Sequence, residues 1–201
     1  MSSSEEIREA LRLFPRRGVR RWGSWRSGSL RSAVAITVVI DGSGSAVLLT
    51  RRTGGLHEHP EQPVLPGLRT NPRESAPDAA RRALAEELGM GLPPESVLGL
   101  LDAYESRSGF VITPVVVWAG ECSEPLRLPG AHVVAVPFAD LDVEPVFVAG
   151  SESDRPVIRL PLHGEWLHAP TAAVLYQFRE VVLRGRRTRV THLQEPIFAW
   201  R

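Results

Sequence analysis

Two adjacent acidic residues, Glu86 and Glu87, stand near the end of a segment that predicts a helix. Helix positions three or four residues apart share a face, so both lie beside position 83, and Arg82 lies one turn before Glu86. Adjacent carboxylates repel each other unless a cation neutralises them. Mg²⁺ takes oxygen ligands and bridges to substrate phosphates, which makes the pair a candidate metal site for diphosphate chemistry. The alternative, more frequent for such a helix in isolation, is a salt-bridged face exposed to solvent.

The spacing around this pair resembles the Nudix hydrolase signature, G-x5-E-x7-R-E-U-x-E-E-x-G-U, in which U is aliphatic. The residues on that spacing are Glu74, Arg82, Leu84, Glu86, Glu87, Gly89 and Met90. The resemblance implies an α/β fold, a Nudix α/β/α sandwich with a mixed β-sheet, and a divalent cation, Mg²⁺ or Mn²⁺, held by Glu86 and Glu87. It also implies that Arg82 orients Glu86 or its neighbours and that Glu74 supports the metal or its water.

A second block, residues 48–67, resembles an extension found in the coenzyme A pyrophosphatase branch of that family, whose pattern is near LLTxRSxxLRxHxGxVxFPGG. The matching residues are Leu48, Leu49, Thr50, Arg52, Leu56, His59, Pro66 and Gly67. Further along, Ser106–Phe110 resembles the segment that follows in the same branch. The likeness implies a small-molecule nucleoside diphosphate derivative as substrate, with a coenzyme A-like compound favoured. The substrate contacts that it implies are Arg52, His59, Gly67 and Arg107.

Two residues depart from the signature at positions that matter for metal chemistry. Ala83 stands where the family has the glutamate after the motif arginine, a carboxylate that normally serves as a metal ligand. Leu68 stands where the family has the second glycine of a pair, so its side chain could obstruct close backbone approach to metal or phosphate. Mg²⁺ can be held by one or two carboxylates plus substrate phosphates, so binding is not excluded, but affinity and rate should drop.

Further departures lie outside the helix. In the extension, His57, Glu61 and Pro63 replace arginine, glycine and valine, and residues 132–136 lack the acidic side chains usual there. A loop carboxylate could supply the missing ligand, because a catalytic base need only reach the site in space. Ordinary surface charge is the alternative for each candidate. The candidates are Glu58, Glu61 and Glu105.

Three functional hypotheses follow. The first is a divalent-metal diphosphohydrolase. The second is a catalytically impaired Nudix-fold protein that binds a nucleotide-like ligand or a partner without turnover. The third is the same fold used for different chemistry. Ala83 separates the first hypothesis from the others, because alanine removes a group that the reaction normally uses.

The predicted elements place these residues on a mixed sheet flanked by helices. The helix at 76–88 has Ser75 as its cap, Pro77 in its first turn and Gly89 at its end. A hairpin with its turn at Asp41-Gly-Ser-Gly and a long loop over residues 51–75 precede it. The other expected elements are strands at 32–40, 46–50, 97–103, 110–118, 133–137 and 157–160, a loop through residues 163–168 and a helix at 171–183.

The first 31 residues are expected to form a helix and a basic arm, ahead of a Nudix-like domain at 32–201. Ser4 is the expected helix cap, Ile7, Leu11 and Phe14 the apolar face, and Pro15 the end. The Arg16–Arg31 segment interleaves arginines with tryptophans. It is either a contact surface for phosphate or nucleic acid, or a solvated arm whose tryptophans pack on the domain, and we favour the second.

Composition narrows the classes of function. The net charge is +1, so nothing global points to nucleic acid or a membrane surface. All 24 basic residues are arginine, which excludes a Schiff-base lysine, and the single Cys122 fits a reducing compartment. No apolar run is long enough to span a bilayer and no signal peptide is evident, so we expect a cytoplasmic protein without a membrane or nucleic-acid partner. Nudix domains often dimerise, which makes a homodimer possible.

Overall fold

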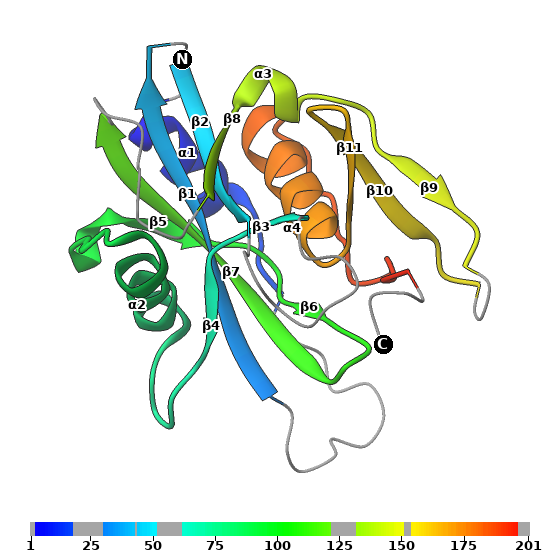
Figure 1. The fold of residues 1–201 in the computed structure, drawn as a ribbon, viewed down its shortest axis with the longest axis horizontal. Coiled ribbons are helices and arrows are strands. Elements are labelled where there is room, and N and C mark those ends of the chain that lie inside the picture. The colour runs from blue at the N-terminus through cyan, green and yellow to red at the C-terminus, as the bar shows by residue number, and fades with distance from the viewer. Residues whose placement is uncertain are drawn as a thin grey trace.

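The computed structural model describes residues 3–17, 30–42, 44–51, 62–121, 132–150 and 154–196. Its main sheet is built on two long strands, β1 and β7, which run parallel, while β2 and β4 are antiparallel to β1 (Figure 1). The strands of this sheet are β1 (Leu30–Asp41), β2 (Gly44–Arg51), β3 (Pro63–Val64), β4 (Gly67–Arg69), β5 (Val97–Leu100), β6 (Tyr104–Glu105), β7 (Phe110–Glu121) and β8 (His132–Pro137). The mixed sheet expected from the sequence is therefore present.

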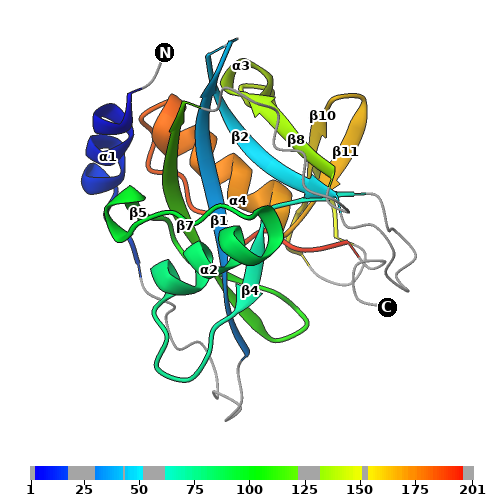
Figure 2. The same cartoon turned by 60° about the vertical axis from the view of Figure 1, so that its left-hand side comes forward.

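Alternation along the strands divides the core into two layers. On β1, Ala35 and Val39 face one layer, whereas Ile36 and Val38 face the other. Helix α2 (Ala76–Leu88) covers the first layer. Helices α1 (Ser4–Leu13) and α4 (Thr171–Phe178) cover the second, so the sheet lies between helices, as the predicted α/β/α sandwich requires (Figure 2).

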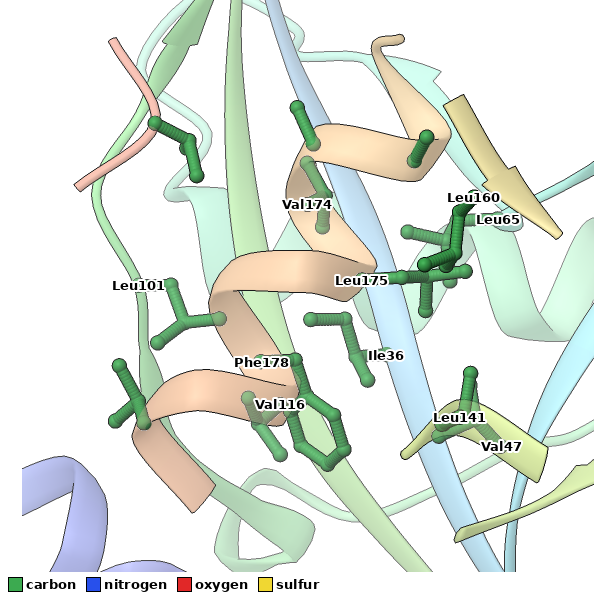
Figure 3. Close-up of a cluster of buried hydrophobic side chains, with 14 of the residues drawn as sticks. Ile36, Val47, Leu65, Leu101, Val116, Leu141, Leu160, Val174, Leu175 and Phe178 are labelled. Atoms are coloured by element: carbon green, nitrogen blue, oxygen red, sulfur yellow. The ribbon is translucent and has the colours of Figure 1, made fainter. Parts of the chain in front are cut away.

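Helix α4 is one of the elements that fill the second layer. Figure 3 shows Val174, Leu175 and Phe178 of this helix among sheet residues such as Ile36 and Val116, all of them buried. The helix predicted at 171–183 is present, but its last turn, η2 (Arg179–Leu183), has π-helical geometry. A shorter helix, α3 (Phe138–Leu141), and a single 3-10 turn, η1 (Pro94–Ser96), complete the helical elements of the described chain.

A second sheet of three strands lies beside α4 (Figure 1). Its strands are β9 (Val146–Val148), β10 (Val157–Leu162) and β11 (Glu165–His168), in the order β11-β10-β9. The prediction of a loop through residues 163–168 was wrong, because β10 and β11 form a tight hairpin. Its two turn residues, His163 and Gly164, both have positive φ, at 50° and 80°. Such turns favour asparagine or aspartate before glycine, so histidine did not signal one.

Three smaller predictions are corrected. The N-cap of α1 is Ser3 rather than Ser4, because Ser3 and Glu6 form a reciprocal capping box. The strand predicted at 97–103 ends at Leu100. The loop predicted at 51–75 contains the short strands β3 and β4, and residues 52–61 lie outside the described part.

The N-terminal helix packs on the same core as the rest of the chain. Ile7, Leu11 and Phe14 are buried, as expected for its apolar face. Beyond the helix, Arg16 donates to the carbonyl of Leu101, and the backbone N–H of Arg17 donates to the Asp102 carboxylate. Most of the basic arm, residues 18–29, lies outside the described residues. Within the described chain, no helix is long and apolar enough to cross a membrane.

Candidate metal and diphosphate site

Helix α2 carries the acidic pair Glu86 and Glu87. Residues within and next to the helix determine where it begins, where it ends and which of its faces is buried. The Ser75 hydroxyl accepts from the backbone N–H of Asp78 at 3.2 Å, and Gly89 ends the helix in the left-handed region with φ 66°. The residues that pack toward the sheet are Ala79, Ala80, Leu84 and Leu88. Arg82, Glu86 and Glu87 are not part of this buried apolar face.

Arg82 joins the helix to the loop before it. Its Nε and Nη2 donate to the two carboxylate oxygens of Glu74 at 2.8 and 3.0 Å, and Nη2 also donates to the Arg69 carbonyl at 2.8 Å. Its Nη1 donates to Glu86 at 3.2 Å. The planar guanidinium therefore contacts Glu86 and the loop at the same time.

Glu74 is held as a carboxylate by these contacts. Arg82 first, and then the backbone N–H of Asn71 at 2.7 Å, lower its pKa from 4.5 to about 2. The Glu74 contacts in turn raise the pKa of Arg82. Both oxygens of Glu74 accept from Arg82, and Oε2 also accepts from the Asn71 N–H, so Glu74 lies beside the arginine that contacts Glu86.

The Glu74–Arg82 pair predicts a defined pH dependence of stability. The folded pKa lies below the unfolded value, so the pair stabilises the protein above about pH 4.5, and this contribution is lost as the pH falls toward 2. Since the pair is partly exposed to solvent, Glu74→Gln should cost about 1–2 kcal/mol at neutral pH. Urea unfolding of both proteins across this range checks it. A difference that persists at about pH 2 would contradict the assignment.

Glu87 is positioned by the backbone of β4. The Gly67 N–H donates to Glu87 Oε1 at 3.2 Å, across 20 residues of sequence. Gly67 packs so closely on β1 that an added Cβ would lie 2.6 Å from Val34 Cγ1 and 2.7 Å from the Ala33 carbonyl oxygen. Glycine is therefore needed here for space, and the close approach delivers the amide to Glu87.

Gly67→Ala should therefore destabilise the fold by about 1–3 kcal/mol, because the new methyl group collides with backbone and with a β-branched side chain. It should also move the amide away from Glu87. Gly42→Ala is the matched control, since nothing lies within 4 Å of its Cβ position, and its effect should stay within about 0.5 kcal/mol. Urea unfolding compares the two variants. Equal stabilities would show that Gly67 is not sterically required.

The two departures from the signature occupy the interface between α2 and β4. Ala83 is fully buried, one helical turn before Glu87. Leu68 is half-buried on β4, paired with Ala33 of β1. At these two positions the chain has methyl and isobutyl groups where the resemblance implies a carboxylate and a glycine.

The other predicted residues are separated from this cluster or lie beyond the described chain. Arg52 and His59, with Glu58 and Glu61, fall in residues 52–61, outside the part of the chain that the structure describes. Glu105 lies on β6, which pairs with β7, whereas β4 pairs with β1. Arg107 follows in the exposed turn between β6 and β7, where its backbone N–H contacts Glu195.

Sequence reasoning missed Glu195. This residue is buried near the C-terminus, and burial raises the pKa of its carboxyl group to about 7, against a smaller opposite effect of Arg107. Tyr104 is also buried, and burial together with the charge of Glu195 raises the pKa of its hydroxyl group. That hydroxyl donates to the Leu193 carbonyl. No spacing in the sequence relates residue 195 to residues 104–107, so only the fold reveals this acid.

The donor set at α2 fits a divalent cation of modest affinity. Glu86 and Glu87 supply hard carboxylate oxygens, and the close packing of Gly67 on β1 brings the backbone of β4 up to Glu87. Among the described residues no group of three histidine, cysteine or acidic side chains forms a ready-made site. Mg²⁺ can be held by one or two carboxylates when waters and substrate phosphates complete its shell, so the chemistry of this pair fits such a cation.

Comparisons with known proteins identify the family to which the chain belongs. The family model of the NUDIX domain matches residues 29–158, more than half of the chain. NudL of Yersinia enterocolitica, described as an uncharacterized Nudix hydrolase, is 36% identical over 95 residues, covering 47% of this chain and 48% of its own. The m7GpppN-mRNA hydrolase NUDT17 of Danio rerio is 25% identical over 144 residues, covering 64% and 48%. This chain therefore spans about half the length of these relatives.

Solved structures give a weaker likeness. A Nudix hydrolase of M. smegmatis, RenU, superposes with a TM-score of 0.46 at 23% identity, over 81% of this chain and 92% of its own. The NUDIX domain of Shewanella oneidensis NrtR, solved with ADP ribose, superposes with a TM-score of 0.44 at 20% identity, over 57% and 77%. From the match to the family model, together with the sandwich fold and the signature helix, the chain belongs to the Nudix family.

Proposed function

We propose that this protein is a divalent-metal-dependent diphosphohydrolase that cleaves a compound linked to a nucleoside diphosphate. The observation that carries the proposal is the arrangement on α2, where Arg82 orients Glu86 and the Gly67 amide holds Glu87. Nudix hydrolases generally use divalent metals, which agrees with a paired carboxylate site. Mg²⁺ or Mn²⁺ is the proposed cofactor.

Each group would have a separate task. Glu86 and Glu87 would hold the cation, which when bound polarises the diphosphate and lowers the pKa of a water. Arg82 keeps Glu86 in place and ties the helix to the loop through Glu74. Gly67 provides the amide that fixes the orientation of Glu87. The protein thus contributes positioning, and the metal contributes charge.

The proposed substrate class comes from the extension before the helix. Residues 48–67 resemble the coenzyme A pyrophosphatase branch, so a coenzyme A-like compound is favoured. Arg52, His59 and Arg107 are the proposed substrate contacts, because arginine and histidine can pair with phosphate oxygens.

The test is hydrolysis of coenzyme A, ADP-ribose, NADH and dinucleoside polyphosphates with Mg²⁺ or Mn²⁺, each repeated with a chelator. We expect metal-dependent release of a nucleoside phosphate, with coenzyme A cleaved at the highest kcat/KM. If a folded protein cleaves none of them above the chelated control, the alternative holds, and the chain is a Nudix-fold module that binds a nucleotide-like ligand without turnover.

Ala83 supports that alternative, because the resemblance implies a carboxylate at this position of α2. We therefore expect that restoring a carboxylate there increases activity. Ala83→Glu restores the implied carboxylate one turn before Glu87, so turnover with Mg²⁺ should rise at least about tenfold if ligand number limits the site. Because Ala83 is fully buried, the variant should lose about 1–3 kcal/mol of stability without metal.

Ala85→Glu is the matched control for this gain, since residue 85 is exposed on the same helix and should leave rate and stability unchanged. Steady-state kinetics and thermal unfolding, with and without Mn²⁺, compare the three proteins. A folded, Mn²⁺-binding Ala83→Glu protein with unchanged turnover would show that another step limits the reaction.

A further inference from the structure

The two faces of the β10–β11 hairpin differ in character. Ile158 and Leu160 of β10 and Leu167 of β11 join the core beneath α4. Side chains alternate along a strand, and Leu160 pairs with Leu167, so the intervening residues lie on the opposite face. We call this the outer face, and its residues are Arg159, Pro161, Trp166 and His168.

Trp166 is the large apolar side chain of the outer face. It is 47% exposed and belongs to neither core cluster, so its indole is not needed to fill the interior. A planar, half-exposed ring offers a surface on which a nucleobase can stack, with an N–H at one edge.

Arg159 supplies a positive charge on the same face. It pairs with His168, which places it diagonally across from Trp166, within reach of long side chains. Its Nε is buried and has no hydrogen-bond partner in the part of the chain that the structure describes. Buried polar atoms are normally satisfied, and a guanidinium pairs well with phosphate oxygens. The orphaned Nε therefore points to an anionic ligand.

The hairpin that carries the outer face contacts the end of β2 and the residue before β3, in the segment that leads to Gly67. Gln62 Nε2 donates to the Trp166 carbonyl at 3.3 Å and lies 3.3 Å from His168 Nδ1. Arg51 pairs with Glu165 at 2.8 Å. Gln62 precedes Gly67 by five residues, which caps their separation at roughly 17 Å for a fully extended chain. One short segment of chain therefore joins the outer face to the Gly67 amide that contacts Glu87.

We propose that the outer face of β10 and β11 binds the nucleoside end of an anionic nucleotide, with the base stacked on Trp166 and a phosphate paired with Arg159. This deepens the proposed function and rests on it, because the diphosphate of the same molecule would reach Glu86 and Glu87. The phosphate that pairs with Arg159 is either carried on the ribose, as in coenzyme A, or part of the 5′ chain. Comparing a nucleotide that carries a phosphate on the ribose with one that does not distinguishes these two possibilities.

The test is calorimetric binding of AMP and of adenosine 3′,5′-bisphosphate to the full chain without metal. Trp166→Ala should weaken both affinities at least about tenfold, about 1.4 kcal/mol, whereas Trp166→Phe should keep them within about threefold. Arg159→Gln should weaken bisphosphate binding more than AMP binding if the ribose phosphate is the partner, and both equally if the 5′ phosphate is.

Phe147→Ala is the matched control, since Phe147 is also 47% exposed but lies on β9, at the other edge of the small sheet. It should bind both nucleotides as the parent does. No binding to the parent, or unchanged binding to Trp166→Ala and Arg159→Gln, overturns the proposal.

Failure of this subsite and failure of the proposed hydrolysis give different results. Nucleotide binding that depends on Trp166, in a protein without metal-dependent cleavage, supports the subsite and rejects the hydrolase. Metal-dependent cleavage whose KM is unchanged by Trp166→Ala and Arg159→Gln supports the hydrolase and rejects the subsite.

Discussion

The double variant Glu86→Gln, Glu87→Gln is expected to lose metal-dependent hydrolysis by at least about a thousandfold in kcat/KM, roughly 4 kcal/mol of transition-state stabilisation. Both substitutions remove a charge from the proposed cation site and preserve side-chain shape. The amide oxygen of residue 87 can still accept from the Gly67 N–H, so the backbone arrangement should survive. The loss would then be due to the metal site and not to misfolding.

Steady-state kinetics with a Mg²⁺ titration measure this loss, and thermal unfolding checks the fold. Glu95→Gln is the control, because Glu95 is an exposed acid of η1 outside the cluster, and its activity should equal that of the parent. If the double variant retained more than about a tenth of the parental kcat/KM, the cation would have to be held elsewhere.

Replacement of Arg179 by methionine is expected to cost about 3–5 kcal/mol of unfolding free energy. Its side chain is 1% exposed and donates to Asp142 at 3.1 Å, Glu144 at 2.8 Å and Glu180 at 3.0 Å. Glu180 is itself only 3% exposed. Methionine would fill much of the volume but leave a buried carboxylate with fewer partners, which is the costly way to break such a pair.

Urea unfolding measures the cost, and two further variants give it a scale. Arg12→Met breaks the exposed Arg12–Glu9 pair of α1 and should leave the unfolding free energy nearly unchanged. Arg179→Met combined with Glu180→Leu removes both buried charges and should recover part of the loss. If Arg179→Met were no less stable than Arg12→Met, the ion cluster would not be what holds α4 to the segment after α3.

Elements whose signals are local could be predicted from the sequence. Helix α2 has its cap, its proline and its terminal glycine within fifteen residues, and the structure confirms each of them. The β1–β2 hairpin follows in the same way from two β-branched runs around Asp41-Gly-Ser-Gly. The β10–β11 hairpin was not predicted, because its turn needs a positive φ at His163, and a histidine at that position is not a typical signal for such a turn.

For the site, the sequence by itself determined which residue types stand at which spacing: Glu86 and Glu87 on one helix, Arg82 a turn before, and alanine at position 83. Only the tertiary structure decided what they contact. Strand pairing between β4 and β1 brings the Gly67 amide to Glu87 across 20 residues. The same folding places Trp166 and Arg159 on one face of a separate sheet and Gln62 against it. Periodicity records neighbours along a helix or strand, whereas contacts between elements depend on how the core packs, and one sequence does not encode that in any local pattern.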